Sequence, residues 1–320
     1  MRVFVTGLIP SAAVDTLRAD QSLTVDVWDG DGPIPRDEFL KRVGGVAGLV
    51  TLLTERVDDE LLTAAGAQLQ IVANVAVGYN NFDMLAIADR QVIATNTPGV
   101  LTDATADVAL ALTLMVTRRL SEGERVIRSG EPWAWGMFYK LGTGIAGKRL
   151  GIVGLGDIGQ AFARRAQACG MTVAYTQRRR LDASVEASLG ATFLSLEELL
   201  RSSDVVSLHC PYSPETHHLI NADALAMMSA HTFLINTARG PIVDEQALVH
   251  ALEMGAIAGA GLDVFEHEPI VHPGLVDRDD VVLLPHLGSA TVETRTAMAM
   301  LAVNNVRAVL SGQPALTPIG

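Results

Sequence analysis

The sequence predicts an α/β protein built from doubly wound parallel sheets. Short runs rich in β-branched residues alternate with helical patterns along nearly all of its 320 residues, as expected for parallel sheets covered by helices. A glycine-rich segment lies between one of these runs and the next helical pattern, and polar residues follow the last three runs. With 49% hydrophobic residues, a chain of this length can form two domains with separate cores.

The first part of the chain is expected to form one doubly wound unit. A long apolar helix is predicted over 103–120, long enough to connect two domains. Residues 121–147 show no clear period and contain Trp133 and Trp135, so we expect a functional loop or an interface arm there. The strands predicted before the long helix cover residues 3–5, 24–28, 46–50, 71–75 and 92–94.

The rest of the chain predicts a second unit followed by a last helix. A helix over 160–169 is expected directly after the glycine-rich segment. The last helix, over 291–310, should return to the first unit, because that unit otherwise has no C-terminal partner. The strands predicted for the second unit cover residues 148–153, 172–175, 205–210, 232–236, 258–264 and 281–284.

Composition excludes several classes of partner. The formal net charge of −12 argues against nucleic-acid binding, which needs a basic face. Cys169 and Cys210 lie in apolar or strand-like segments without metal-ligand spacing, which is typical of reduced thiols in a cytoplasmic protein. The N-terminus has no signal-peptide pattern, and no apolar run is long enough to cross a membrane. We therefore expect a cytoplasmic protein without nucleic-acid or membrane partners.

The glycine-rich segment GLGDIG at 154–159 predicts a dinucleotide-binding turn, because a strand precedes it and a helix and a second strand follow. The first glycine permits a tight turn, the second lets the backbone approach a pyrophosphate, and the third allows close helix packing. The helix N-terminus then offers N–H groups and a partial positive charge to the phosphates. The expected coenzyme contacts are Gly154, Leu155, Gly156, Asp157, Ile158 and Gly159.

The end of the following strand indicates which coenzyme is bound. NAD binders place an Asp or Glu there for the ribose hydroxyls, whereas this chain has TQRRR at 176–180. No acid would repel a 2′-phosphate, and guanidinium groups can hold one. The segment favours NADPH over NADH, with Arg178 and Arg179 as the expected contacts, and the alternative is a solvated basic loop.

Polar side chains follow the last three predicted strands. Carboxyl ends of parallel strands meet at one edge of a sheet, so Arg239, Glu268 and His286 are expected beside the glycine turn. His286 can donate a proton to a developing alkoxide, and Arg239 can hold a carboxylate and its carbonyl oxygen. Glu268 can hold one imidazole nitrogen. Each residue also has a purely structural alternative. The other histidines lack metal-ligand spacing, so no metal site is expected.

Four segments resemble the D-isomer-specific 2-hydroxyacid dehydrogenases, and the resemblance covers essentially the whole chain. It implies hydride transfer between a nicotinamide coenzyme and a 2-keto or 2-hydroxy acid. It also implies Arg239 as the substrate clamp, Glu268 as the partner of the histidine and His286 as the acid/base. The segments are GLGDIG at 154–159, NTARGPIVDEQAL at 236–248, GAGLDVFEHEP at 259–269 and PHLGSAT at 285–291.

The same resemblance implies an architecture and further contacts. A Rossmann coenzyme domain, residues 100–289, would be inserted in a flavodoxin-like substrate domain, residues 1–99 and 290–320. Homodimers would form through the coenzyme domains. Backbone N–H groups of Val77 and Gly78 would bind the substrate carboxylate. The additional coenzyme contacts that it implies are Thr105, Gln177, Cys210, Pro211, Thr216, Thr237, Asp263 and Gly288.

Within the family, residues 52–58 and 97–105 look most like the NADPH-dependent glyoxylate/hydroxypyruvate reductases. In that group a tryptophan of the dimer arm reaches the neighbouring active site, and Trp135 is the matching position. Leu53 and Trp135 are expected to line the substrate pocket. The expected reaction is reduction of glyoxylate or hydroxypyruvate to the D-hydroxy acid. Two alternatives stay open: a dehydrogenase of bulkier 2-keto acids such as phenylpyruvate, and a dinucleotide-sensing interaction protein.

Overall fold

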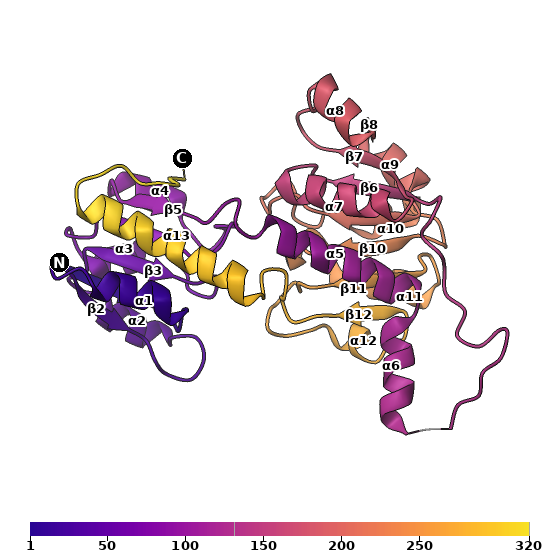
Figure 1. The fold of residues 1–320 in the computed structure, drawn as a ribbon, viewed down its shortest axis with the longest axis horizontal. Helices are drawn as coiled ribbons and strands as arrows, with labels where there is room; N and C mark the ends of the chain where they lie inside the picture. Colours follow the sequence, from indigo (N-terminus) through magenta and orange to yellow (C-terminus); the bar gives the residue numbers. More distant parts are fainter. Residues whose placement is uncertain (131, 320) are drawn as a thin grey trace. The chain divides into compact units, whose positions relative to one another are not determined.

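The computed structural model describes residues 1–130 and 132–319, and the chain divides into two compact units, each built on its own sheet. Unit 1 comprises Met1–Leu101 and Ala290–Gly320, and unit 2 comprises Thr102–Ser289. All pairings between the named strands are parallel. The predicted α/β class with two helix-covered parallel sheets is confirmed (Figure 1).

Unit 1 carries helices on both faces of a sheet with the strand order β2-β1-β3-β4-β5. Its strands are β1 (Arg2–Val5), β2 (Thr24–Val27), β3 (Gly48–Thr51), β4 (Ile71–Asn74) and β5 (Ile93–Thr95). Its helices are α1 (Ser11–Arg18), α2 (Arg36–Arg42), α3 (Asp59–Ala65), α4 (Met84–Asp89) and α13 (Val292–Leu310). Neighbouring side chains of a strand point to opposite faces. Val3 and Val5 therefore pack with α1 and α13, whereas Phe4 packs with α2, α3 and α4.

Unit 2 has the strand order β12-β11-β10-β9-β6-β7-β8. Its strands are β6 (Arg149–Val153), β7 (Thr172–Thr176), β8 (Ala191–Phe193), β9 (Val205–Leu208), β10 (Phe233–Asn236), β11 (Gly259–Leu262) and β12 (Val281–Leu283). Its helices are α5 (Thr102–Thr117), α6 (Leu120–Ser129), α7 (Asp157–Ala168), α8 (Ala183–Leu189), α9 (Leu196–Ser202), α10 (Ala222–Met227), α11 (Glu245–Glu253) and α12 (Pro273–Val276). The direction of strand addition reverses between β6 and β9, so the loops after these two strands flank the switch point where ligands bind in such sheets.

Two elements differ from the sequence-based expectation. The long helix predicted over 103–120 ends at Thr117, because Arg119 adopts the left-handed conformation with a φ of +55°. Helix α6 then forms inside a segment that was expected to be irregular. Its apolar residues Leu120 and Ile127 are exposed, and Glu122 is its buried residue. The few apolar residues of α6 recur at helical spacing, but the helix is short and mostly polar, and residues 132–147, which follow it, are irregular.

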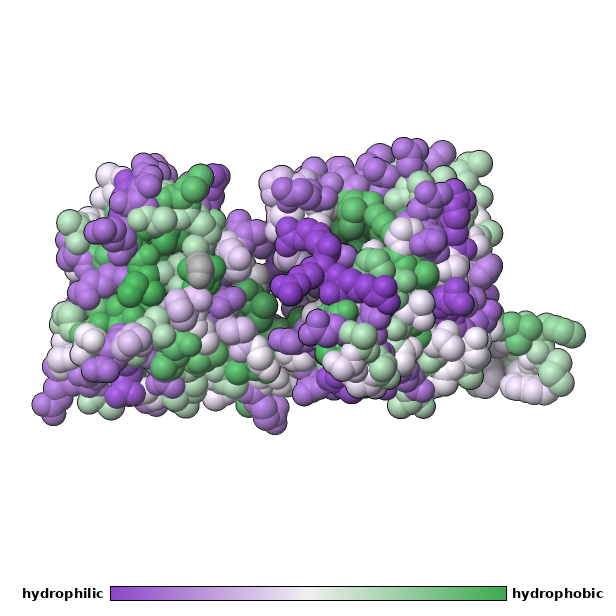
Figure 2. All heavy atoms as spheres, turned by 90° about the horizontal axis from the view of Figure 1, so that it is seen from above, coloured by the Kyte–Doolittle hydropathy of each residue, from purple (hydrophilic) through white to green (hydrophobic). Residues whose placement is uncertain are grey.

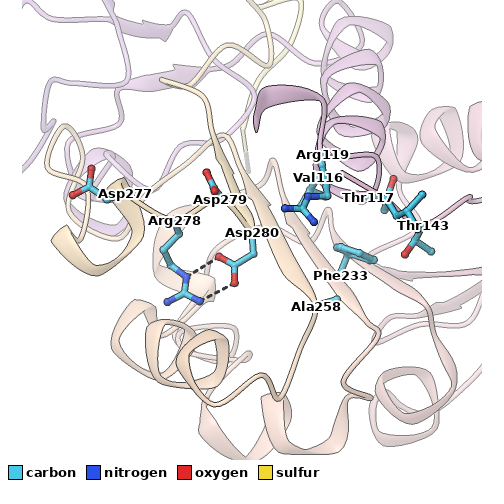
Figure 3. Close-up of a pocket in the computed structure, with 12 residues that line it drawn as sticks. Val116, Thr117, Arg119, Thr143, Phe233, Ala258, Asp277, Arg278, Asp279 and Asp280 are labelled. Atoms are coloured by element: carbon cyan, nitrogen blue, oxygen red, sulfur yellow. Dashed lines mark hydrogen bonds and ion pairs between the residues drawn. The ribbon is translucent and has the colours of Figure 1, made fainter. Parts of the chain in front are cut away.

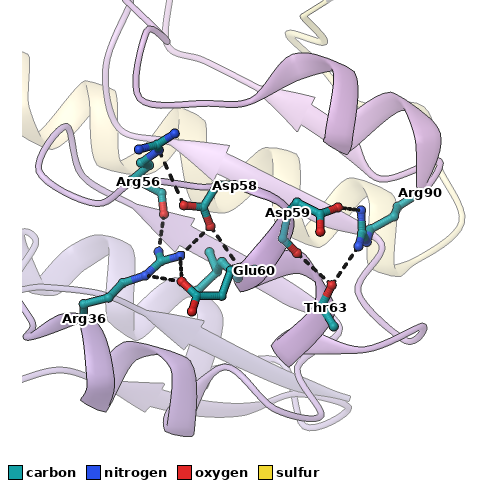
Figure 4. A network of polar contacts seen from close by, with 8 residues as sticks. Arg36, Arg56, Asp58, Asp59, Glu60, Thr63 and Arg90 are labelled. Carbon is teal, nitrogen blue, oxygen red and sulfur yellow. Dashed lines mark hydrogen bonds and ion pairs between the residues drawn. The ribbon is translucent and has the colours of Figure 1, made fainter.

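A surface network of charged groups fixes the beginning of α3 in unit 1 (Figure 4). Arg36, at the start of α2, donates to Asp58 and, at 2.8 Å, to Glu60. Asp58 is also the N-cap of α3. Arg90 contacts Asp59 at 2.5 Å. Exposed ion pairs of this kind contribute about 0–1 kcal/mol each, so packing supplies most of the stability of this unit. Among the described residues, no helix combines the length and apolar character needed to span a membrane.

Candidate active site

The loop between β6 and α7 has the geometry of a dinucleotide-binding turn. Gly154 has a φ of +95°, and a Cβ there would lie 2.7 Å from the backbone nitrogen of Cys210. A Cβ on Gly159 would lie 2.5 Å from the carbonyl oxygen of Gly154. Both positions therefore require glycine. Gly156, the N-cap of α7, has open space where a Cβ would stand and gives the helix no side-chain cap. A phosphate can thus approach the N–H groups of the first helical turn.

Groups on the neighbouring loops also fit a dinucleotide. Thr237 follows β10 and is buried, and its hydroxyl has no hydrogen-bond partner within the described part of the chain. A buried hydroxyl of this kind is costly unless a ligand or water satisfies it. Cys210, Pro211 and Thr216 share the loop after β9, where the Thr216 hydroxyl donates to the Pro211 carbonyl at 2.9 Å. Cys210, Pro211 and Thr216 therefore lie on a loop that flanks the switch point. Thr237 lies on the loop after β10, the strand next to β9.

The loop after β7 is tied to the glycine turn by Gln177. Its side-chain oxygen accepts a hydrogen bond from the backbone N–H of Leu155 at 3.0 Å, and its amide nitrogen donates to the carbonyl of Arg179 at 2.7 Å. Arg178 and Arg179 are exposed, whereas Arg180 forms an ion pair with a carboxylate of α8. The side chain of Gln177 thus fixes the loop that carries the two expected 2′-phosphate contacts.

The three candidate catalytic side chains follow β10, β11 and β12, which are neighbours in the sheet. The imidazole Nδ1 of His286 lies 2.9 Å from Oε2 of Glu268, and Oε1 of Glu268 accepts from the Phe265 N–H at 3.0 Å. A carboxylate can only accept, so Nδ1 is the donor and Nε2 is the nitrogen that can exchange a proton with a ligand. The Arg239 guanidinium donates to the Ala238 carbonyl at 2.7 Å.

Asp263 holds the turn that presents the histidine. Its two carboxylate oxygens accept from the backbone N–H groups of Leu287 at 2.6 Å and Gly288 at 2.7 Å. Its carbonyl accepts from the N–H of His286 at 2.8 Å, and His286 has a left-handed φ of +55°. Thr105 contributes from α5, where its hydroxyl donates to the Gly288 carbonyl at 3.2 Å. The buried Asp263 therefore fixes the backbone around His286, and its expected contact with the nicotinamide stays a prediction.

Burial and mutual charge set the ionisation of these groups. Burial raises the pKa of Asp263, and the hydrogen bonds from the turn offset only part of this effect. Burial also acts to raise the pKa of Glu268, but the hydrogen bond and charge of His286 outweigh it, and the pKa lies below its usual value. Burial lowers the pKa of Arg239, and the negative charge of Glu268 opposes that change. At neutral pH Glu268 is therefore an anion beside a guanidinium that stays charged.

In unit 1, the expected substrate contacts lie on the loops after β3 and β4. Leu53 follows β3, and Val77 and Gly78 follow β4. Asn74 donates its side-chain N–H to the Gly78 carbonyl at 3.0 Å, and Asn96 donates to the Val77 carbonyl at 2.8 Å. Asn96 thus fixes the Val77–Gly78 peptide group, whose N–H is one of the expected carboxylate donors, and Asn74 fixes the peptide group that follows it.

The loop that carries Leu53 is fixed by two residues that sequence reasoning missed. Buried Glu55 accepts hydrogen bonds from the Thr6 hydroxyl at 2.5 Å and the Leu52 N–H at 2.7 Å. Asn81 donates to the Leu52 carbonyl at 3.2 Å and the Glu55 carbonyl at 3.0 Å. For Glu55 the sequence offered one signal, a charged residue four positions after the end of the buried strand β3.

The segment after α6, residues 132–144, forms an arm that displays apolar side chains. Trp135 is 79% exposed, and Met137 and Phe138 are similarly exposed. Figure 2 shows hydrophobic residues protruding at its right-hand edge, where this arm lies in Figure 1. Lys140 anchors the arm through an ion pair with the buried Glu122 of α6. Exposed apolar groups of this size are typical of a protein–protein contact.

A cavity of about 590 Å³ lies elsewhere in unit 2 (Figure 3). Its lining includes Phe233, the first residue of β10, and Ala258, which precedes β11. It also includes Arg278 and Asp280, which form a two-bonded ion pair before β12. The cavity therefore lies at the amino ends of the strands, at the opposite sheet edge from His286. Within residues 1–130 and 132–319, no cluster of His, Cys, Asp and Glu could hold a metal ion.

Comparisons with known proteins show the family of this chain. Residues 110–288 match the model of the family described as D-isomer specific 2-hydroxyacid dehydrogenase, NAD binding domain. A glyoxylate reductase from Thermococcus onnurineus is 47% identical over 98% of this chain and 93% of its own length. A crystal structure of a glyoxylate reductase from Paecilomyes thermophila has a TM-score of 0.90 at 34% identity, covering 100% of this chain and 98% of that chain.

A second solved structure is the NADPH-dependent glyoxylate/hydroxypyruvate reductase from Sinorhizobium meliloti, in complex with NADP and malonate. It has a TM-score of 0.84 at 35% identity, and the match covers 100% of this chain and 96% of that one. The fold and the matches define an oxidoreductase with an NAD(P)-binding domain. The chain belongs to the D-isomer-specific 2-hydroxyacid dehydrogenases, and the resemblance noted in its sequence is confirmed.

Proposed function

We propose that this enzyme reduces glyoxylate and hydroxypyruvate to D-2-hydroxy acids with NADPH. The observation that carries the proposal is the 2.9 Å contact between His286, which follows β12, and Glu268, which follows β11. Arg239 follows β10, the next strand of the sheet. The names of the relatives in Thermococcus onnurineus and Sinorhizobium meliloti support glyoxylate as the substrate. The Sinorhizobium protein also supports hydroxypyruvate and NADPH.

The chemistry divides between the coenzyme and the side chains. A bound NADPH supplies the hydride that reduces the carbonyl carbon of the 2-keto acid. His286 donates the proton from Nε2 to the oxygen that gains negative charge. Glu268 orients the imidazole by accepting the hydrogen bond from Nδ1. Arg239 holds the carboxylate with a rigid, permanently charged group, and the N–H groups of Val77 and Gly78 are its further donors.

The NADPH preference is supported by the loop after β7. No carboxylate occupies the segment 176–180, and Arg178 and Arg179 are exposed on a turn that Gln177 ties to the glycine loop. Two guanidinium groups can neutralise a 2′-phosphate through charge-assisted hydrogen bonds. NADH lacks this phosphate and would gain nothing from them.

We also propose a homodimer through the coenzyme domains, in which Trp135 of the arm reaches the active site of the partner subunit. The support is the exposure of Trp135, Met137 and Phe138 on an arm that is anchored at its base. Leu53 and Trp135 would then limit the size of the substrate. A cytoplasmic location stays a prediction.

A substrate panel tests this function. The protein is assayed with glyoxylate, hydroxypyruvate and phenylpyruvate, each with NADPH and with NADH. The proposal expects the highest kcat/KM for the two small acids with NADPH. A preference for phenylpyruvate would assign the enzyme to bulkier substrates, and equal rates with NADH would remove the coenzyme preference. Tight coenzyme binding without turnover of any keto acid would instead indicate a dinucleotide sensor.

A further inference from the structure

Arg180, the third arginine of the loop after β7, is bound by side chains of neighbouring elements. Arg180 makes a two-bonded ion pair with Glu186 of α8, with Nε and Nη2 each 2.8 Å from a carboxylate oxygen. Its guanidinium carbon lies 5.5 Å from the centre of the Phe193 ring. A paired and stacked guanidinium is costly to release. Arg180 is therefore a structural element of the loop.

Tyr175 joins both ends of the same loop. Its hydroxyl donates to the carboxylate of Glu186 at 2.5 Å and accepts from the backbone N–H of Leu181 at 3.0 Å. The ring is buried and packs edge-on against Phe193, with ring centres 5.3 Å apart. The hydrogen bond from Arg180 and, to a smaller extent, the one from Tyr175 lower the pKa of Glu186 to about 2. The carboxylate therefore stays charged across the working pH range.

These contacts fix both ends of the turn that carries two exposed arginines. Gln177 fixes the beginning of the turn to the glycine loop, and the hydroxyl of Tyr175 fixes Leu181 at its end. Arg178 and Arg179 lie between these two fixed points. A cation presented on a fixed turn loses less conformational freedom when it binds a ligand, and this raises affinity.

We propose that Tyr175 and Glu186 are positioning residues for coenzyme selection. They hold Arg180 aside and fix the turn that presents Arg178 and Arg179, and so they set the affinity for a 2′-phosphate without touching it. This inference rests on the proposed NADPH preference.

Binding of two small ligands tests the proposal without any catalytic step. Adenosine 2′,5′-bisphosphate carries the 2′-phosphate, and 5′-AMP lacks it. Calorimetric titration of Tyr175→Phe and Glu186→Gln should show the Kd for the bisphosphate raised about three- to tenfold. The Kd for 5′-AMP should stay within about twofold of that of the unaltered protein. Glu197→Gln, which removes an exposed carboxylate paired with Arg201 on α9, is the control and should change neither value.

The outcomes distinguish the coenzyme preference from the positioning role of Tyr175 and Glu186. If the unaltered protein binds both ligands equally, the NADPH preference and this inference are both wrong. If it discriminates but neither variant changes the bisphosphate Kd, only the positioning role is wrong. If both Kd values rise equally in the variants, the substitutions have destabilised the domain as a whole. If Glu186→Gln binds the bisphosphate more tightly, Arg180 binds the 2′-phosphate once Glu186 no longer pairs with it. Either result would overturn the proposal.

Discussion

The imidazole Nδ1 of His286 donates a hydrogen bond to Oε2 of Glu268 at 2.9 Å, although the residues are 18 positions apart and follow different strands. Asp263, at the end of β11, fixes the left-handed turn at His286 through three hydrogen bonds. Orientation of the imidazole therefore depends on the Glu268 carboxylate, which contacts the ring, and on Asp263, which binds the backbone N–H groups of residues 286–288. This double support keeps Nε2 directed for proton transfer while Nδ1 stays engaged.

Replacing Glu268 by Gln should lower turnover. The amide preserves the shape of the side chain, but it can donate as well as accept, so it no longer requires Nδ1 of His286 to be the donor. The expected loss of kcat is about a hundredfold, the lower end of what general acid catalysis contributes, with the Kd for NADPH unchanged. Turnover of glyoxylate by the variant and by the unaltered protein checks this. Unchanged turnover in a folded variant would contradict the positioning role of Glu268.

Arg239→Lys should weaken transition-state binding while leaving the charge in place. A lysine offers a compact charge and cannot reproduce the planar pair of donors. The expected loss of kcat/KM is about tenfold to a hundredfold, with the Kd for NADPH unchanged. Arg201→Lys, on the exposed surface of α9, is the matched control. Wild-type kinetics in Arg239→Lys would remove the clamp role.

Glu122→Gln should weaken the base of the arm in a pH-dependent way. The hydrogen bond from Arg119, helped by Lys140 and opposed by burial, lowers the pKa of Glu122 from 4.5 to about 2. A lowered carboxyl pKa stabilises the fold above the unfolded pKa, and this stabilisation is lost as the pH falls from about 4.5 through about 2.

The free energy of unfolding of Glu122→Gln should therefore be about 2 kcal/mol lower than that of the unaltered protein at pH 7. Urea denaturation at several pH values should show this gap narrowing below pH 4.5, the unshifted carboxyl value. Glu124→Gln, an exposed member of an ion pair on the same helix, serves as the control and should have little effect at any pH. A gap that does not depend on pH would mean that the carboxylate charge is not what stabilises the arm.

The sequence predicted which side chains lie together after the strand ends, and their catalytic roles stay predictions. Glu268 and His286 were predictable as neighbours because parallel strands end at one edge, and side chains just beyond those ends converge there. Glu55, Asn81 and Glu186 were not predictable, since each acts through side-chain contacts with segments that pattern analysis treats separately. Helix α6 was missed for a related reason: it buries a charged residue and exposes apolar ones.

NADPH oxidation by His286→Ala in the presence of glyoxylate tests most directly whether His286 is the proton donor. The unaltered protein and His250→Ala, which changes an exposed histidine of α11, provide the reference. Turnover is expected to fall by about two to four orders of magnitude in His286→Ala, while the Kd for NADPH and the folded state remain unchanged. A loss of less than about tenfold in a folded, NADPH-binding variant would contradict the assignment of His286 as the acid.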